Sequence, residues 1–365
     1  MAESHGICGL VAKWFMKFFQ PLPILPHDII YDILLLQPIN SVGRFRCVCR
    51  EWNNLLTRSD FIKKHVLKAS GKHRLIVSSL EYHVSRDLEA PYNIVMTKLE
   101  FPWKEHVHEI MGSCNGLLCV FVDHNYLFLW NPTTRVYKQL PPPPSWLEKP
   151  IYHPLFYGFG YNISIDGCYN YKVVIGGHGI KSSIVEVYCQ KTSSWRRIQD
   201  FPCLNTLQAR GTFVNGFLHW LGFVGRGNGY SNNYCHNIVF LDLAKEEFGE
   251  VLVPNFENPY VLLGLGVLNG MLCVMCSHSS GWEICAMKEY GVPESWIALI
   301  TIPYRLWTTV QMSAPFYWMN TGELVMQRDD EMMVVYDPRK KSFKKLIDSK
   351  SRIESTTYVE SLESP

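Results

Sequence analysis

The closely spaced cysteines and histidines are the side chains of this sequence that could bind a metal ion. Cys47 and Cys49 lie in FRCVCREWNNLL, and Cys273 and Cys276 form a CxxC motif in NGMLCVMC. A structural zinc site usually takes two such pairs, and no second pair stands at that spacing here. The motifs alone therefore predict no metal site.

The expected backbone also separates the members of each pair. Residues two apart in a helix are rotated by about 200°, so Cys47 and Cys49 would diverge. Alternatively the helix breaks at Val48 and Cys49, and Cys49 begins the next helix. Residues three apart in a strand point to opposite faces, so Cys273 and Cys276 would not share an ion. Both readings make these cysteines structural.

Two histidines form the other candidate metal pair. His106 and His108 flank a glutamate in WKEHVHEI and would share one face of a strand. Because no third ligand can be identified, we interpret them as loop histidines. We expect no metal, no cofactor and no catalytic residue, since no nucleophile–base pair or phosphate-binding loop is recognisable.

Composition narrows the classes of protein further. The 35 lysines and arginines nearly balance the 33 aspartates and glutamates, which argues against nucleic-acid binding. A hydrophobic content of 47% argues against disorder. The 12 cysteines are scattered and no clear secretory signal is visible, so we expect reduced thiols in the cytoplasm, the nucleus or both.

The segment from Gly6 to Gln20, GICGLVAKWFMKFFQ, has apolar residues at helical spacing. Lys13 and Lys17 interrupt it well short of the roughly 20 apolar residues of a membrane span, so we expect no transmembrane segment. We interpret residues 1–21 as an amphipathic extension that packs on its own protein. An interfacial membrane helix and a partner-binding helix remain alternatives.

Residues 22–70 have the pattern of three to four short helices. Pro26 and Asp28 suit the first turn of a helix that Pro38 stops. Asn40 or Ser41 is expected to cap a second helix, and a last one begins at Ser59 or Asp60. So small a unit hides little apolar surface and is expected to need a partner.

This segment resembles the F-box family in Leu25-Pro26, Ile29, Ile33-Leu34, Pro38, Ser41-Val42, Arg44-Phe45, Cys47-Val48-Cys49 and Trp52. The resemblance implies docking on a Skp-type adaptor that leads to a cullin. The residues it carries over as adaptor contacts are Leu25, Pro26, Ile29, Ile33, Leu36, Pro38 and Val42. Gln37 replaces the usual leucine before the proline and Gly43 weakens the second helix, so both could lower adaptor affinity.

Beyond residue 71 the pattern becomes one of short β-rich runs. Turns with Asn-Gly or a near equivalent recur about every 50 residues, and each is followed by apolar strands. These turns begin at Asn115, Asp166, Asn215, Asn269 and Asn320. A later strand of each repeat carries an aromatic residue, namely Tyr137, Trp195, Phe248, Trp296 and Phe343. Each repeat is therefore expected to be a four-stranded antiparallel sheet.

Such repeats predict an all-β propeller, whose closure removes exposed sheet edges. Five blades are legible, and the stretch 72–103 can form a sixth with help from the C-terminus. GSCNGLLCVF, LWNPTTRVYKQLP and GTFVNGFLHWL resemble the F-box-associated, kelch-like domain of plant F-box proteins. The expected organisation is a propeller of about six blades over residues 71–348 and a tail over 349–365.

Loops rich in aromatic residues and glycine are the expected target-binding surface, since loops on rigid scaffolds commonly carry binding. The candidate anchors are Trp146, Arg226, Tyr230 and Trp307. The LPPPPSWLEKP stretch is either a polyproline ligand or, as we favour, a stiff connection between blades. We expect these loops to be used on the face away from the helical unit.

Taken with the resemblance, these features predict a non-catalytic substrate receptor of a Skp–cullin–F-box ubiquitin ligase. The head would dock the adaptor and the propeller would bind an unidentified target protein. One alternative is a propeller enzyme acting on glycans, which would need two or more acids facing the central channel. Another is an adaptor-binding F-box protein that delivers no target.

Overall fold

The chain divides into two compact units after His65, and each is described by itself. The computed structural model describes residues 25–69, 73–79, 82–90, 96–101, 107–123, 126–144, 156–178, 183–203, 205–206, 208–225, 234–253, 261–278, 281–304, 312–328 and 331–365. No helix in these ranges is long and apolar enough to cross a membrane. The amphipathic segment 1–21 lies outside the described residues.

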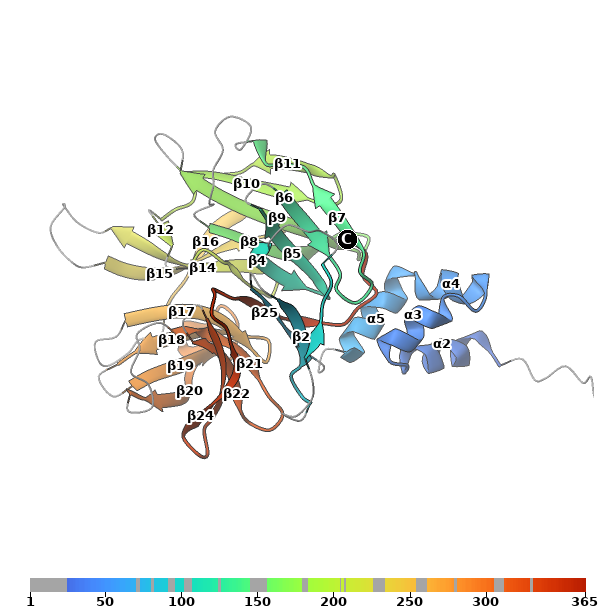
Figure 1. Ribbon diagram of the computed structural model, residues 1–365. Helices are drawn as coiled ribbons and strands as arrows, with labels where there is room; N and C mark the ends of the chain where they lie inside the picture. The colour runs from blue at the N-terminus through green and yellow to red at the C-terminus, as the bar shows by residue number, and fades with distance from the viewer. Residues whose placement is uncertain are drawn as a thin grey trace, which may run out of the picture. The chain divides into compact units, whose positions relative to one another are not determined.

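The N-terminal unit has four helices in its described part, which begins at residue 25 (Figure 1). They are α2 (His27–Leu35), α3 (Ile39–Phe45), α4 (Arg50–Leu56) and α5 (Ser59–Ala69). The carbonyl of Pro26 accepts hydrogen bonds from the N–H groups of Ile29 and Ile30, which starts α2 where proline and aspartate predicted it. The starts of α2 and α5 confirm the positions expected from Pro26 and Asp28 and from Ser59 or Asp60.

The two middle helices test the expected caps. The prediction that Asn40 or Ser41 caps α3 was wrong, because Pro38 is the N-cap and the helix begins at Ile39, whose side chain is buried. At α4 the alternative with a helix break is confirmed. Cys49 is extended, and its Sγ accepts a hydrogen bond from the Trp52 N–H at 3.4 Å. Cys49 therefore takes the place of the usual serine or aspartate cap.

The core of this unit is small. Leu34, Val42, Leu56 and Phe61 are almost completely buried, and the ring of Tyr31 meets that of Phe61 edge-on at 5.4 Å. Two further contacts join the helices. Phe45 packs edge-on against Trp52, and His65 Nε2 lies 3.0 Å from the backbone oxygen of Gln37. A few apolar side chains therefore hold the four helices together.

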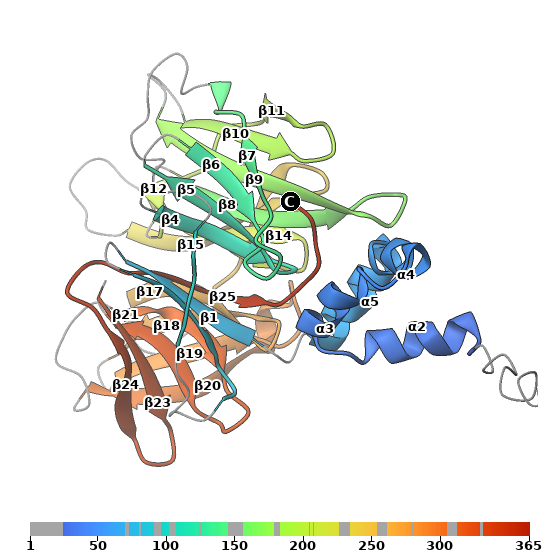
Figure 2. The ribbon, with the colours of Figure 1, turned by 45° about the vertical axis from the view of Figure 1, so that its right-hand side comes forward.

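The second unit contains six antiparallel sheets, which confirms a six-bladed propeller (Figures 1 and 2). Blade 1 holds β25 (Glu354–Val359), β1 (His73–Ser78), β2 (His83–Asp87) and β3 (Thr97–Lys98). Blade 2 holds β4 (Val107–Cys114), β5 (Leu117–Val122), β6 (Tyr126–Trp130) and β7 (Tyr137–Leu140). Blade 3 holds β8 (Phe156–Ile163), β9 (Tyr169–His178), β10 (Ser183–Cys189) and β11 (Ser194–Arg197).

The remaining blades follow the same order from the inner to the outer strand. Blade 4 holds β12 (Asn205–Thr206), β13 (Thr212–Val214), β14 (Phe217–Gly225), β15 (Tyr234–Asp242) and β16 (Glu247–Val251). Blade 5 holds β17 (Val261–Leu268), β18 (Met271–Ser277), β19 (Gly281–Met287), the 3-10 turn η1 (Pro293–Ser295) and β20 (Trp296–Pro303). Blade 6 holds β21 (Met312–Trp318), β22 (Leu324–Arg328), β23 (Met332–Asp337) and β24 (Ser342–Asp348).

In three of the repeats the first turn has the expected left-handed backbone. Asn115, Asn215 and Asn269 have φ between 50° and 53°, and the glycine after each lies between 77° and 85°. Two successive residues in the left-handed region make the type I′ geometry that matches the twist of a hairpin. The Asn-Gly pairs therefore fix the positions of three hairpin turns, between β4 and β5, β13 and β14, and β17 and β18.

The turn between the last two strands of a blade contains a second repeated hydrogen-bond pattern, which sequence reasoning missed. The side-chain oxygens of Asn131, Asp242 and Asp337 each accept hydrogen bonds from two backbone N–H groups just ahead of them. Four residues further on, Arg135, Glu246 and Lys341 adopt positive φ. An Asx turn therefore shapes this connection in blades 2, 4 and 6.

The ring closes in blade 1. The C-terminal strand β25 pairs antiparallel with β1, with Leu75 opposite Thr357, and Figure 2 shows the red β25 beside the blue β1. This confirms the expected help from the C-terminus. The segment 349–365, set apart above as a tail, therefore contains the innermost strand of a blade, and the propeller extends beyond residue 348.

Asn131 anchors the chain end that follows this closing strand. Its Nδ2 donates hydrogen bonds to the backbone oxygens of Ser361 at 3.0 Å and Glu363 at 2.7 Å, and the side chain is fully buried. Asp242 and Asp337 serve the same type of turn without this contact. An amide is required at residue 131 because a carboxylate cannot donate to two carbonyl oxygens.

We therefore predict that Asn131→Asp lowers the free energy of unfolding by about 2–3 kcal/mol, because it buries a charge against two carbonyl oxygens. Thermal unfolding and limited proteolysis of the C-terminal segment measure the effect. Asp242→Asn is the matched control and should change stability by less than about 1 kcal/mol, since the turn-forming oxygen remains. Equal effects of the two substitutions would contradict this account of closure.

Candidate functional site

An exposed apolar face of α2 is the first candidate site. Leu25, Ile29, Ile33 and Leu36 are between 44% and 70% exposed and follow one another at spacings of three and four residues. Leu34 and Leu35 point to the other side and are buried. Pro26 and Pro38, at the two ends of the helix, are also exposed. A row of exposed aliphatic side chains on one helix face is typical of a docking surface.

Val42 differs from the other residues that the resemblance carries over. Its side chain is fully buried in α3, within the core of the helical unit. A residue with no exposed surface offers nothing for a partner to contact directly. The structure therefore places Val42 in the core of the helical unit, and the six remaining residues form the exposed apolar face, named here the α2 face.

Several predicted site residues lie outside the described part of the chain. These are the four candidate target anchors Trp146, Arg226, Tyr230 and Trp307, together with His106. For His108 the backbone belongs to β4 but the side chain is not described. The target-binding assignment and the paired histidines therefore stay predictions from sequence.

The central channel of the propeller is the second candidate site, and sequence reasoning missed it. A cavity of about 500 Å³ is lined by inner strands of blades 1 to 5 and by Gln327 of blade 6. Its polar side chains include Glu109, Tyr157, Gln208, Arg210, Gln327 and Glu354. Their sequence spacing carries no signal, because the six residues meet only when the ring closes.

Arg210 enters the channel because the inner strand of blade 4 is interrupted. The Tyr157 N–H donates to the Ala209 carbonyl at 2.8 Å, and the Gly211 N–H donates to the Tyr157 carbonyl at 2.7 Å. The segment that connects β12 to β13 thus forms backbone hydrogen bonds with β8 of blade 3. A Cβ on Gly211 would lie 2.7 Å from the ring of the fully buried Trp220, so only glycine fits there.

A network of charges joins Arg210 to the closing strand. Its guanidinium donates to Glu354 Oε2 at 2.6 Å and to the Ser355 carbonyl at 2.7 Å. Arg352 donates to Glu354 Oε1 at 3.1 Å. Both carboxylate oxygens of Glu354 are therefore bound by arginines.

Glu109 is the second acid of the channel. Burial raises the pKa of its carboxyl, the negative charge of Glu354 raises this pKa further, and a hydrogen bond with Tyr157 opposes the shift. Among the described residues, its Oε2 has no hydrogen-bond partner. Burial also raises the pKa of Tyr157, so that phenol stays protonated. The channel thus holds one acid bound by two arginines and one acid whose ionisation is opposed by burial.

Glu109 and Glu354 both face the central channel, as a propeller enzyme acting on glycans would require. Glycoside hydrolysis needs one carboxylate free to attack or to activate water and one carboxylic acid free to donate a proton. Glu109 has the raised pKa of a proton donor, but Glu354 is bound by Arg210 and Arg352 on both oxygens. The arrangement favours a locked ion-pair network over a pair of working acids.

Comparison with known families decides what kind of protein carries these two sites. Residues 73–363 match the F-box associated beta propeller domain, and residues 22–64 match the F-box domain. This chain belongs to the F-box proteins with an associated propeller. The F-box match covers the α2 face, and the propeller match includes the closing strand β25.

Curated relatives are F-box proteins of Arabidopsis thaliana. An F-box/kelch-repeat protein is 29% identical over 303 residues, which cover 76% of this chain and 79% of the relative. F-box protein CPR1 is 28% identical over 376 residues, which cover 93% of this chain and 88% of CPR1. The match to CPR1 thus spans nearly the whole of both chains.

For this F-box protein we predict a pH-dependent effect of Glu109→Gln. A raised carboxyl pKa stabilises the folded state fully below the unfolded pKa of about 4.5, and this stability is lost as pH rises through the folded pKa. The variant should therefore unfold at the same temperature as wild type in acid and at a higher temperature at neutral pH. Each unit of raised pKa corresponds to about 1.4 kcal/mol.

Thermal unfolding between about pH 4.5 and pH 8 measures this difference. Glu247→Gln, on the outer strand β16, is the control and should shift the unfolding temperature by a constant amount. A constant difference for Glu109→Gln as well would contradict the raised pKa.

Proposed function

We propose that this F-box protein is the substrate receptor of a Skp–cullin–F-box ubiquitin ligase, acting in the cytoplasm or the nucleus. The observation that carries the proposal is the α2 face on an F-box that is joined to a recognition propeller. The helical unit would bind a Skp-type adaptor and, through it, a cullin. The propeller would bind a target protein.

The α2 face has the physical properties of an adaptor-binding surface. Its aliphatic side chains cost free energy while water covers them, at about 25 cal/mol for each Å² of apolar area. Docking on an apolar groove would remove this cost, with the exposed carboxylates of Asp28 and Asp32 at the rim of the interface. Val42 and Leu34 lie in the core of the helical unit.

Gln37 and Gly43, the two departures from the family pattern, can be accommodated locally. The Gln37 Nε2 donates to the Ile33 carbonyl at 3.1 Å, so its side chain folds back on the end of α2. Nothing lies within 4 Å of the Cβ position at Gly43. We propose that neither residue blocks the adaptor, and that Gly43 acts only through the lower helix propensity of glycine.

The mechanism requires positioning and no chemistry from this chain. The adaptor and cullin would hold a charged conjugating enzyme, and the propeller would hold the target, so that a lysine of the target attacks the thioester at high effective concentration. The ion-paired state of Glu354 agrees with a channel that takes no part in catalysis. The receptor would therefore act as a rigid link.

The adaptor prediction is tested with Ile29→Asp combined with Ile33→Asp. Two charges on the α2 face should weaken binding of a Skp-type adaptor by at least about 100-fold, measured by co-purification and calorimetry. Both positions are exposed, so the helical unit should remain folded by circular dichroism. Ile165→Asp, an exposed aliphatic residue in blade 3, is the control and should bind normally. Adaptor binding that survives the double substitution would sink the proposal.

The target surface is proposed from sequence alone. Alanine substitutions at Trp146, Arg226, Tyr230 and Trp307 should reduce proximity labelling of a target while leaving adaptor binding intact, because large aromatic and arginine anchors dominate interfaces. Targets retained by all four variants would place the site elsewhere. Captured proteins that are never ubiquitinated would favour the alternative of an F-box protein that delivers no target.

A further inference from the structure

A compact cluster of cysteine, histidine and glutamate side chains lies in blade 5, outside the residues that line the channel. Cys276 on β18 stands directly opposite Glu283 on β19 in the hairpin register. His278 follows Cys276 by two residues, and Cys285 follows Glu283 by two. Side chains alternate along a strand and opposite residues share a face, so β18 and β19 place all four on one side of the sheet.

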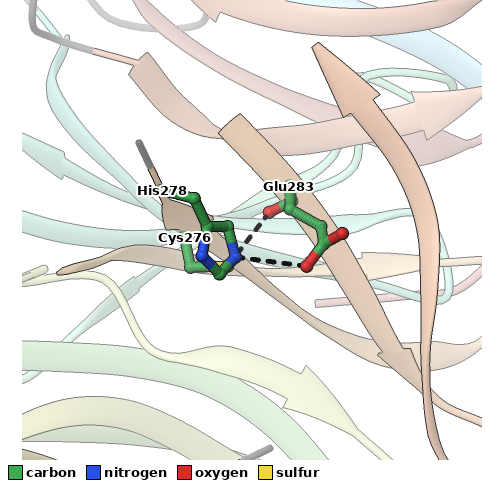
Figure 3. Close-up of side chains that lie close together, drawn as sticks. All are labelled: Cys276, His278 and Glu283. Atoms are coloured by element: carbon green, nitrogen blue, oxygen red, sulfur yellow. Dashed lines mark hydrogen bonds and ion pairs between the residues drawn. The ribbon is translucent and has the colours of Figure 1, made fainter. Parts of the chain in front are cut away.

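The side chains converge in space. Figure 3 shows Cys276, His278 and Glu283 pointing toward one another. His278 Nε2 lies 3.3 Å from Cys276 Sγ and 3.2 Å from Glu283 Oε2, and Cys285 Sγ lies 3.7 Å from Glu283 Oε2. The possible ligand atoms of Cys276, His278 and Glu283 all lie within 4.8 Å of one another.

These separations fit the edges of a metal tetrahedron. Zinc binds nitrogen and oxygen at about 2.0–2.1 Å and sulfur at about 2.3 Å, so the ligand atoms of a tetrahedral site stand about 3.3–3.8 Å apart. The two separations from His278 Nε2, 3.3 Å to Cys276 Sγ and 3.2 Å to Glu283 Oε2, lie within about 0.1 Å of the short end of this range. We propose that Cys276, His278 and Glu283 bind a zinc ion, with Cys285 beside the site.

The burial of the three ligands suits a metal site with an entry path. Cys276 is buried, whereas the side chains of His278 and Glu283 are 14% and 21% exposed. The sulfur thus faces the interior and the two other ligands lie toward solvent. Three protein ligands from two strands would cross-link β18 and β19, and a water molecule would take the fourth position.

The backbone of the histidine is held by a neighbouring residue. Tyr304, at the end of β20, donates its hydroxyl hydrogen to the His278 carbonyl, and its ring meets that of Trp282 edge-on at 5.2 Å. Its hydroxyl also lies beside Ser277 Oγ. Such support orients a ligand before the metal arrives, which is the usual role of residues around a zinc site.

The CxxC motif suggested Cys273 as the second metal ligand beside Cys276, but the two side chains lie on opposite faces of β18. Cys273 packs between blades 5 and 6, whereas Cys276 packs in the cluster shared with blade 4, so the two lie on opposite faces as expected. The expectation of no metal site followed from pairs within one segment. The cluster becomes visible only with the β18–β19 register, which brings the glutamate and Cys285 to Cys276 and His278.

The test measures metal binding by the full chain in complex with its adaptor. Reduced protein is stripped with a chelator and titrated with Zn²⁺ or Co²⁺ at about pH 7.5. We expect one zinc ion per chain by mass spectrometry of metals, and a cobalt spectrum with tetrahedral and thiolate charge-transfer bands. His278→Asn and Cys276→Ser should each weaken zinc binding by at least about 100-fold.

Cys273→Ser is the matched control, because it removes a buried thiol from the other face of the same strand, and it should keep the zinc and the cobalt bands. Circular dichroism checks that each variant is folded. A wild-type protein without thiolate–cobalt bands, or zinc binding unchanged by both ligand substitutions, would overturn the proposal. The cluster would then be a hydrogen-bonded group only, in which His278 Nε2 and Glu283 Oε2 share a hydrogen bond.

Discussion

Pairing of β25 with β1 is the constraint on which the rest of the propeller depends. It joins the two ends of the propeller sequence in one sheet and converts an open row of blades into a ring. The inner strands then contact one another in sequence, from β25 through β4, β8, β13, β17 and β21. Without closure, both terminal blades would expose unpaired edges, and the channel residues would not meet.

The helical unit, in contrast, leaves apolar surface uncovered. It buries few side chains and leaves a row of aliphatic residues on α2 exposed, so its own folding does not use all of its apolar surface. Leu34 and Leu35 serve the core while Ile29 and Ile33 serve the outside, although all four are large aliphatic residues. Only the angular position on the helix separates the two roles.

Local signals in the sequence predicted a large part of the fold. The Asn-Gly turns predicted strand positions because a left-handed backbone at two successive residues leaves few alternatives, and Pro26 and Pro38 predicted the limits of α2. Signals that depend on long-range pairing were missed. Glu109, Arg210 and Glu354 meet through closure, Cys276 meets Glu283 through register, and the burial of Val42 depends on helix packing. Residue spacing contains none of this information.

The charged residues of the channel select the register in which β25 closes the ring. Burying Arg210 with Glu354 gains little net free energy over an apolar pair, since desolvation offsets most of the attraction. An unpaired arginine in the channel would cost several kcal/mol, however, so the network penalises any register of β25 that moves Glu354 away. A slip by one residue would also turn Tyr358 away from Ser85, whose hydroxyl lies 2.9 Å from the phenol. The polar contacts thus select the closing register, while the apolar clusters between blades provide most of the stability.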